Sequence, residues 1–219
     1  MAEVAGGLFI AVEGGEGVGK SSFVKTLAVR LRAQGHDLVT SREPGGTPVA
    51  DALRALFAHP PQGERLSIVT EALMVSAGRS QHCDQVIRPA LAAGQWVLCD
   101  RYADSTRVYQ GEMGGLSPAV TEELIAISTR GLRPHVTFVL DCPVDVSLQR
   151  LQGRSGSGHV DAVGRYDAVA AVDHERRRAA YLAILKANPG SHVLIDASAS
   201  TEAMVTAALH HLEVRVGQT

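Results

Sequence analysis

Five short apolar runs recur along the chain, and each is followed by a brief loop and then by sequence of helical character. The runs are Leu8–Glu13, Asp37–Thr40, Gln95–Asp100, Val136–Asp141 and His192–Asp196. Strands that alternate with helices predict a parallel sheet, since parallel strands need a crossover between them. All runs except Asp37–Thr40 are unbroken, which is typical of strands covered by helices on both faces. We therefore predict an α/β fold, a three-layer α/β/α sandwich on a five-stranded parallel sheet, with those four strands in central positions.

Amphipathic segments between the runs predict the helices that cover the sheet. We expect helices at Ser22–Gln34 and Pro118–Thr129, and a last helix at Thr201–Val214 that packs on the sheet and ends the domain. The segment Gln152–Gly164 breaks the pattern, because its glycines and serines offer little to bury. We predict a single domain over 1–219, with a flexible lid at about 152–166.

Charge and cysteine content exclude several classes of protein. The formal net charge of −2 is unsuited to a broad electrostatic grip on nucleic acid, so no nucleic-acid partner is expected. The first apolar run is too short for a signal peptide or a membrane span, and we expect no membrane contact. Three dispersed cysteines, Cys83, Cys99 and Cys142, indicate buried thiols in a reducing compartment, and so a cytoplasmic protein. The histidines have no metal-ligand spacing.

The segment directly after the first run matches the phosphate-binding motif G-x-x-x-x-G-K-[ST] and opens a helix. Its glycines let backbone N–H groups point at phosphate oxygens, Lys20 reaches the outer phosphates, and Ser21 suits Mg²⁺. The motif predicts a P-loop NTPase fold that binds ATP with Mg²⁺. We expect the ATP phosphates to contact Gly14, Gly15, Glu16, Gly17, Val18, Gly19, Lys20, Ser21 and Ser22.

A second carboxylate for the metal follows the third run. Asp100 stands at the carboxyl end of that strand, where a parallel sheet presents its ligand crevice, so Asp100 is expected to act on Mg²⁺ with Ser21. The alternative is a helix N-cap. A GTPase is excluded because the sole asparagine, Asn188, precedes a proline, and the catalytic loop of protein kinases is absent. An ATPase, a switch protein and a small-molecule kinase remain open.

Several further motifs together resemble the bacterial branch of the thymidylate kinase family, nearly from end to end. The most specific are Ser41-Arg42-Glu43-Pro44-Gly45-Gly46-Thr47, Asp100-Arg101-Tyr102 with Asp104-Ser105-Thr106, and Tyr109-Gln110-Gly111. Further matches are Thr70-Glu71-Ala72-Leu73, Arg79-Ser80-Gln81-His82 and Ile87-Arg88-Pro89-Ala90-Leu91-Ala92-Ala93-Gly94. The resemblance implies transfer of the γ-phosphate of ATP to dTMP, making dTDP, in a homodimer.

The resemblance also implies a role for each matching residue. Arg42 and Arg101 would grip the acceptor phosphate, Arg101 acting also in catalysis with Lys20, and Arg79 would bond the thymine edge. The base and sugar would contact Pro44, Val75, Ser105, Tyr109 and Gln110. Glu16 would face the sugar 3′-hydroxyl and the acceptor phosphate. From the residues alone, Glu16 could equally be a solvated loop residue, Arg42 a turn arginine and Tyr109 a core aromatic.

The lid would supply the cation that this P-loop lacks. Positive charge is needed on the bridging and γ oxygens as they separate, and Arg150, Arg154 and Arg165 are candidates, of which we name Arg154 as catalytic. Arg150 and Arg154 are four residues apart and would share a helix face.

The chain departs from the family pattern in the base pocket and at the lid. Val75 stands where relatives usually carry a stacking aromatic, and Gly78 where they carry aspartate. Gly164-Arg165-Tyr166-Asp167 keeps an arginine but loses or shortens two acids. Two alternatives to thymidylate phosphorylation are therefore a kinase for another pyrimidine monophosphate and a regulatory nucleotide-binding protein without transfer activity.

Overall fold

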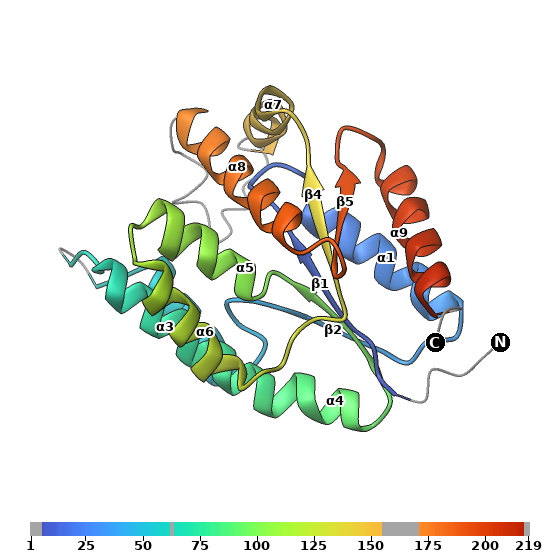
Figure 1. The fold of residues 1–219 in the computed structure, drawn as a ribbon, viewed down its shortest axis with the longest axis horizontal. Helices are drawn as coiled ribbons and strands as arrows, with labels where there is room; N and C mark the ends of the chain where they lie inside the picture. The colour runs from blue at the N-terminus through green and yellow to red at the C-terminus, as the bar shows by residue number, and fades with distance from the viewer. Residues whose placement is uncertain (1–5, 62–63, 155–170, 217–219) are drawn as a thin grey trace.

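A parallel five-stranded sheet forms the centre of the computed structural model, which describes residues 6–61, 64–154 and 171–216 (Figure 1). Its strands are β1 Phe9–Glu13, β2 Leu38–Arg42, β3 Trp96–Asp100, β4 Val136–Asp141 and β5 His192–Asp196. The strand order is β2-β3-β1-β4-β5. The predicted fold class is confirmed, and so are all five predicted strands to within a few residues.

The position predicted for the last strand is wrong. β5 lies at an edge and pairs only with β4, and Leu194 on it is 50% exposed. An unbroken apolar run indicates that helices cover both faces of a strand, but it does not indicate whether one or two strands pair with it. Only Ile195 of β5 is fully buried, against the helical layer formed by α1 and α9.

Helices connect the strands and cover both faces of the sheet. They are α1 Lys20–Ala33, α2 Pro48–Ala58, α3 Ile68–His82, η1 Cys83–Ile87, α4 Arg88–Ala92, α5 Ala103–Thr106, η2 Arg107–Met113, α6 Pro118–Thr129, α7 Val144–Arg154, α8 Ala171–Ala187 and α9 Thr201–Val216, η1 and η2 being π-helical. Local sequence explains several starts: Thr47, Ser67 and Ser117 each accept a hydrogen bond from a first-turn N–H through the side chain.

Two apolar layers flank the sheet. On one face α1 and α9 pack against alternate residues of the strands, with Phe23, Leu27 and Leu209 buried beside Ile10 and Phe138. On the other face η1, α4, α5 and α6 contribute to a second cluster, and α8 packs beside η2 (Figure 1). The three-layer arrangement and the docking of the last helix are therefore as predicted.

The described part of the chain sets limits on two further predictions. Most of the predicted lid at 152–166, including Arg165, lies outside the described residues, as does the side chain of Arg154, the residue that ends α7. Among the helices that are described, none combines the length and apolar character required to cross a membrane.

The sheet brings three functional segments together at the carboxyl ends of its strands. Arg42 pairs in register with Asp100, Asp100 with Val12, and Glu13 with Val139, so β1, β2 and β3 end side by side. The chain leaves β1 toward β2 on one side and later reaches β4 on the other. This is a topological switch point, where open parallel sheets bind ligands.

Candidate active site

The loop after β1 has the predicted strand–loop–helix geometry of a phosphate cradle. Gly19 is the N-cap of α1 with φ 90°, and Gly17 has φ 76°, in the left-handed region that favours glycine. A side chain on Gly17 would also collide with the carbonyl of Ser147. The N-terminus of α1 therefore stands open to an anion, with backbone N–H groups and the helix dipole directed at it.

Lys20 is buried and is held by its own loop. Its ammonium donates to the carbonyl of Gly14 at 2.9 Å and to that of Gly15. Burial and then the charge of Arg101 lower the pKa of Lys20 to about 8, against the opposing effect of nearby carboxylates that include Asp100. A nearby anion favours the charged form of the ammonium, so a phosphate group in the cradle would oppose both effects and raise the pKa of Lys20 again.

Ser21 and Asp100 line the same cleft, as a shared role at Mg²⁺ requires. The Oδ1 atom of Asp100 is buried and has no hydrogen-bond partner within the described part of the chain, so this oxygen is available as a metal ligand. The N-cap alternative is wrong, because Tyr102 occupies that position of α5. Among the described residues no three His, Cys, Asp or Glu side chains gather, and Mg²⁺ bound through one carboxylate, one hydroxyl, phosphates and water needs no such cluster.

Four of the nine predicted phosphate contacts do not line the cleft: Gly14, Gly15, Val18 and Ser22. Ser22 is exposed, and the Val18 side chain packs into the core below the loop. At Val18 a role in phosphate binding can therefore involve only the backbone.

Glu16 is buried, so its interpretation as a solvated loop residue is wrong. Its Oε1 accepts a very short hydrogen bond from the Tyr109 hydroxyl, and its Oε2 pairs with Arg177 at 2.8 Å. Arg101 lies 3.5 Å from Oε1. Burial would raise the pKa of Glu16, but the charges of Arg101, Lys20 and Arg177 outweigh burial and lower it. Glu16 is thus an anion clamped between the P-loop and the acceptor side.

Arg101 bridges the two parts of the site. It has φ 69°, a strained conformation for a residue other than glycine, at the turn where β3 ends. Its Nη1 donates to the Gly14 carbonyl and to the hydroxyls of Ser105 and Tyr181, at 3.1–3.3 Å. The guanidinium also lies over the Tyr109 ring, 5.1 Å from its centroid.

A second pocket lies beside the phosphate cleft and collects most of the residues predicted to bind the acceptor. It is lined by Glu43, Pro44, Arg54, Phe57, Val75, Arg79, Arg101, Tyr102, Ser105, Thr106, Tyr109 and Gln110. Glu16 and Arg42 are the exceptions, because both line the phosphate cleft instead. Arg42 is half-exposed there, with Nη2 3.7 Å from Asp51 Oδ1. The sequence therefore predicted most of the residues that meet in this pocket, and their roles in binding stay predictions.

Hydrogen bonds from two of its three nitrogens hold the Arg79 guanidinium in place. Its Nε donates to Glu43 at 2.8 Å, and its Nη2 donates to the Tyr102 carbonyl at 3.1 Å and to Thr106 Oγ1 at 2.9 Å. Its Nη1 is buried and has no hydrogen-bond partner in residues 6–61, 64–154 and 171–216. Burial would lower the pKa of Arg79, but Glu43 raises it above its ordinary value. A buried, charged donor without a partner in a pocket wall is suited to the carbonyl oxygen of a ligand.

Glu43 continues this network away from the pocket. Its Oε1 contacts His82 Nδ1 at 3.0 Å, and His82 Nε2 contacts the Ser41 hydroxyl at 2.6 Å. The motif after β2 is therefore tied to α3 by a chain of buried polar contacts, which holds Arg79 in place.

Four functional side chains were not predicted from the sequence: Glu13, Glu43, Phe57 and Arg177. Arg177 is buried on α8 and pairs with Glu16, 161 positions away in the chain. Within its run of three arginines, Arg176–Arg178, nothing in the sequence distinguishes the buried member. Glu13 had a detectable signal, since a carboxylate that ends a buried strand demands a partner. Glu43 follows β2, of which only Leu38 is buried, and had no such signal.

The lid prediction is tested only at its edge. Arg150 donates to the Ala197 carbonyl at 2.8 Å, so this arginine ties α7 to the loop after β5. Arg154 and Arg165, the other two candidates for the lid cation, stay predictions.

A phosphate cradle at a topological switch point, next to a separate pocket with buried arginines, defines a P-loop phosphotransferase with distinct donor and acceptor sites. The family model for thymidylate kinase matches residues 12–208. The thymidylate kinase of Caulobacter vibrioides is 44% identical over 209 residues, which cover 95% of this chain and 97% of that protein. That of Geotalea uraniireducens is 40% identical over 206 residues, covering 93% and 96%.

A solved structure agrees with these sequence relatives. The crystal structure of thymidylate kinase from Ehrlichia chaffeensis superposes with a TM-score of 0.75 at 25% identity, covering 94% of this chain and 99% of that one. The chain therefore belongs to the thymidylate kinase family, and the predicted resemblance is confirmed.

Proposed function

We propose that this enzyme transfers the γ-phosphate of ATP to the phosphate of dTMP, with Mg²⁺, giving ADP and dTDP. The single observation that carries the choice of acceptor is Arg79, which lines the second pocket and whose buried Nη1 has no hydrogen-bond partner among the described residues. A pyrimidine with a carbonyl at position 4 supplies the acceptor that this nitrogen lacks. Family membership and the shared pocket with Arg101 support the same assignment.

Positioning and charge neutralisation would do most of the catalytic work. A phosphate oxygen that attacks is already an anion, so no general base is required. Lys20 and Arg101 would lie on the two sides of the transferred group, and both touch the carbonyl of Gly14. Mg²⁺ held by Ser21 and Asp100 would neutralise charge on the ATP phosphates, and Arg154 in the lid would add a further cation.

The pocket supplies an aromatic surface from an unexpected place. Val75 offers no ring, but Phe57 on α2 lines the same pocket and is 7% exposed. Gly78 does not line the pocket, because it faces α2, and a Cβ there would lie 3.6 Å from that of Ala50. Of the two departures in this helix, only Val75 bears on the base.

Comparison of acceptors tests the proposal. We expect turnover in a coupled ADP-release assay with dTMP at least tenfold above that with dUMP, dCMP, UMP or AMP. Failure on all of them would reject nucleotide phosphorylation, and preference for dUMP or dCMP would favour a different pyrimidine kinase, the alternative that Val75 raises. Arg101→Ala should abolish transfer and leave ATP binding intact, whereas a regulatory protein without transfer activity has no need of the second pocket.

We also infer a homodimer formed through α3 and α6. Val69 and Leu73 on α3 are 50% and 53% exposed, and Val120 and Ile127 on the adjoining α6 are 42% and 64% exposed. Sedimentation should give a dimer that Leu73→Glu dissociates, whereas Val29→Glu, at a comparably exposed apolar position on α1, should leave it intact. A monomeric wild-type protein would reject this interface.

A cytoplasmic location is the remaining proposal. Cys83, Cys99 and Cys142 are all free and buried, which suits a reducing compartment.

A further inference from the structure

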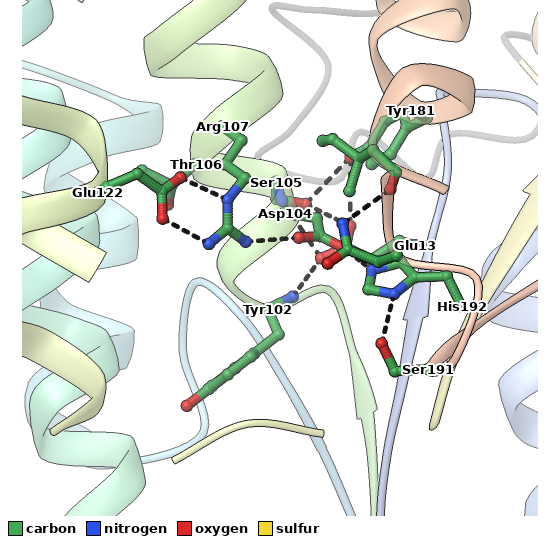
Figure 2. Close-up of polar contacts among 12 residues, drawn as sticks. Glu13, Tyr102, Asp104, Ser105, Thr106, Arg107, Glu122, Tyr181, Ser191 and His192 are labelled. Atoms are coloured by element: carbon green, nitrogen blue, oxygen red, sulfur yellow. Dashed lines mark hydrogen bonds and ion pairs between the residues drawn. The ribbon is translucent and has the colours of Figure 1, made fainter. Parts of the chain in front are cut away.

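The last residue of β1 carries a buried carboxylate that the reaction described above does not use. Glu13 is 0% exposed and immediately precedes the first glycine of the P-loop. Figure 2 shows its side chain among groups from the turn after β3, from α5 and from α8. A fully buried carboxylate is costly unless donors surround it, so its contacts are informative.

The two oxygens of Glu13 have different partners. Oε1 accepts from two backbone N–H groups, those of Tyr102 at 2.7 Å and Ser105 at 3.2 Å. Oε2 accepts from two hydroxyls, those of Ser105 at 2.8 Å and Tyr181 at 3.2 Å (Figure 2). One oxygen therefore fixes the backbone of the turn, and the other fixes side chains.

The same two hydroxyls are the neighbours of Arg101. Nη1 of Arg101 lies 3.2 Å from Ser105 Oγ and 3.1 Å from Tyr181 Oη. A hydroxyl has one proton, and if this proton is donated to Glu13, a lone pair is left to accept from the guanidinium. Glu13 and Arg101 are thus joined through two hydroxyl bridges, without direct contact, and the two hydroxyls also lie 3.2 Å from each other.

We propose that Glu13 is a positioning residue: it sets the direction of the Ser105 and Tyr181 hydroxyl protons and thereby holds Arg101 in place for the acceptor phosphate. This inference rests on the role proposed for Arg101 above. An ionised Glu13 leaves both hydroxyls as acceptors for Arg101. A neutral side chain that donates a hydrogen turns a hydroxyl proton toward the guanidinium, and Arg101 then loses a partner.

The surroundings of Glu13 support a change of this kind near neutral pH. Burial and then the charge of Asp104 raise the pKa of Glu13 to about 7, against the opposing effect of Arg101. Asp104 itself stays an anion: burial would raise its pKa, but contacts with His192 at 2.8 Å and Arg107 at 2.6 Å outweigh burial and lower it (Figure 2). Three other titratable groups interact electrostatically with Glu13: Lys20, Cys99 and Tyr181.

The Glu13→Gln variant tests the inference because it keeps the shape and one carbonyl oxygen for the two backbone N–H groups. Its amide would face the hydroxyls as a donor. We expect KM for dTMP to rise about tenfold, the effect of one lost hydrogen bond to a charged group, while KM for ATP stays within about twofold. Glu122→Gln is the matched control: Glu122 is an exposed carboxylate that pairs with Arg107 in the same view, and its substitution should change neither constant.

Coupling between the bridges gives a readout that a purely structural role would not move. Tyr181→Phe removes one hydroxyl, and its effect on KM for dTMP should largely disappear in the Glu13→Gln background, since the bridge is already broken there. Additive effects of the two substitutions would contradict the bridge.

The pH dependence separates Glu13 from the substrate, whose phosphate also titrates near pH 6. Dividing kcat/KM of the wild type by that of Glu13→Gln at each pH cancels the ionisation of dTMP, and the ratio should rise several-fold through about pH 7. A flat ratio, or equal KM values, would overturn the positioning role. If Arg101→Ala uses dTMP as well as the wild type does, the role of Arg101 fails first and the inference falls with it.

Discussion

Removal of the Glu43 carboxylate is expected to destabilise the protein strongly and to weaken dTMP binding. Glu43 is 5% exposed and pairs with Arg79 and with His82, at 2.8 and 3.0 Å. In Glu43→Ala the guanidinium keeps only two neutral acceptors, the Tyr102 carbonyl and the Thr106 hydroxyl. A buried ion pair that loses one member costs about 3–5 kcal/mol, because the remaining charge is neither solvated nor neutralised.

Two further variants separate charge from shape. Glu43→Gln retains an oxygen for Arg79 and should cost only about 1–2 kcal/mol. The double variant Glu43→Met/Arg79→Met removes both charges and should be more stable than Glu43→Ala alone. An exposed pair provides the control: Arg30 and Glu202 lie 3.3 Å apart with side chains 49% and 68% exposed, so Glu202→Ala should cost about 0–1 kcal/mol.

The free energy of unfolding, measured by urea denaturation with a common slope, checks this ranking. For Glu43→Gln, which should remain folded, KM for dTMP should also rise, because Arg79 is less firmly placed, while KM for ATP should not. If Glu43→Ala loses no more stability than Glu202→Ala, the buried Glu43–Arg79 pair does not stabilise the wall of the pocket and the reasoning is refuted.

Three other substitutions test the site at separate points. Gly17→Ala should lower stability by about 1–3 kcal/mol and abolish ATP binding, because φ is 76° and the added Cβ would collide with backbone atoms. Gly190→Ala is the control, because a Cβ there meets open space. It should change neither the melting temperature in differential scanning fluorimetry nor ATP affinity in a titration. Arg177→Met should remove a cation that lowers the pKa of Glu16, so the acid limb of the pH profile of kcat/KM should move to higher pH; an unmoved limb would contradict the pairing. Glu13 binds its proton more tightly in the folded state, so its stabilising contribution is present below pH 4.5 and is lost as the pH rises through about 7. The free energy of unfolding should therefore fall by about 3 kcal/mol between pH 4.5 and about pH 7 on account of Glu13. Urea denaturation across this range should show this fall in the wild type but not in Glu13→Gln.

Much of the architecture could be predicted because its causes are local. Four of the five strand runs are unbroken apolar stretches, and Ser117 followed by Pro118 fixes the start of α6 at the predicted residue. The P-loop could be placed because its glycines and lysine act through backbone geometry that the motif itself specifies. The acceptor pocket was also predicted, since motif resemblance carries information that local patterns lack.

The failures have a different origin, in contacts between distant parts of the chain. β5 was placed centrally because coverage by helices and pairing with strands leave the same apolar signature. Arg177 was missed because only the fold brings α8 against the P-loop, where Glu16 accepts its charge. Phe57 was missed because the aromatic side chain was sought on α3, and the pocket receives it from α2.

The two halves of the site differ in how far they are prepared for their ligands. On the acceptor side Arg79 and Arg101 are held by buried acceptors, so little ordering is needed when a nucleotide enters. On the donor side Lys20 is bound to the carbonyl of Gly14, which also accepts from Arg101. A phosphate that draws Lys20 away leaves the Gly14 carbonyl to Arg101 alone and strengthens that contact. Occupation of the cradle would then hold Arg101, the arginine proposed to bind the acceptor phosphate, more firmly, which is a physical link between the two proposed sites through one backbone oxygen.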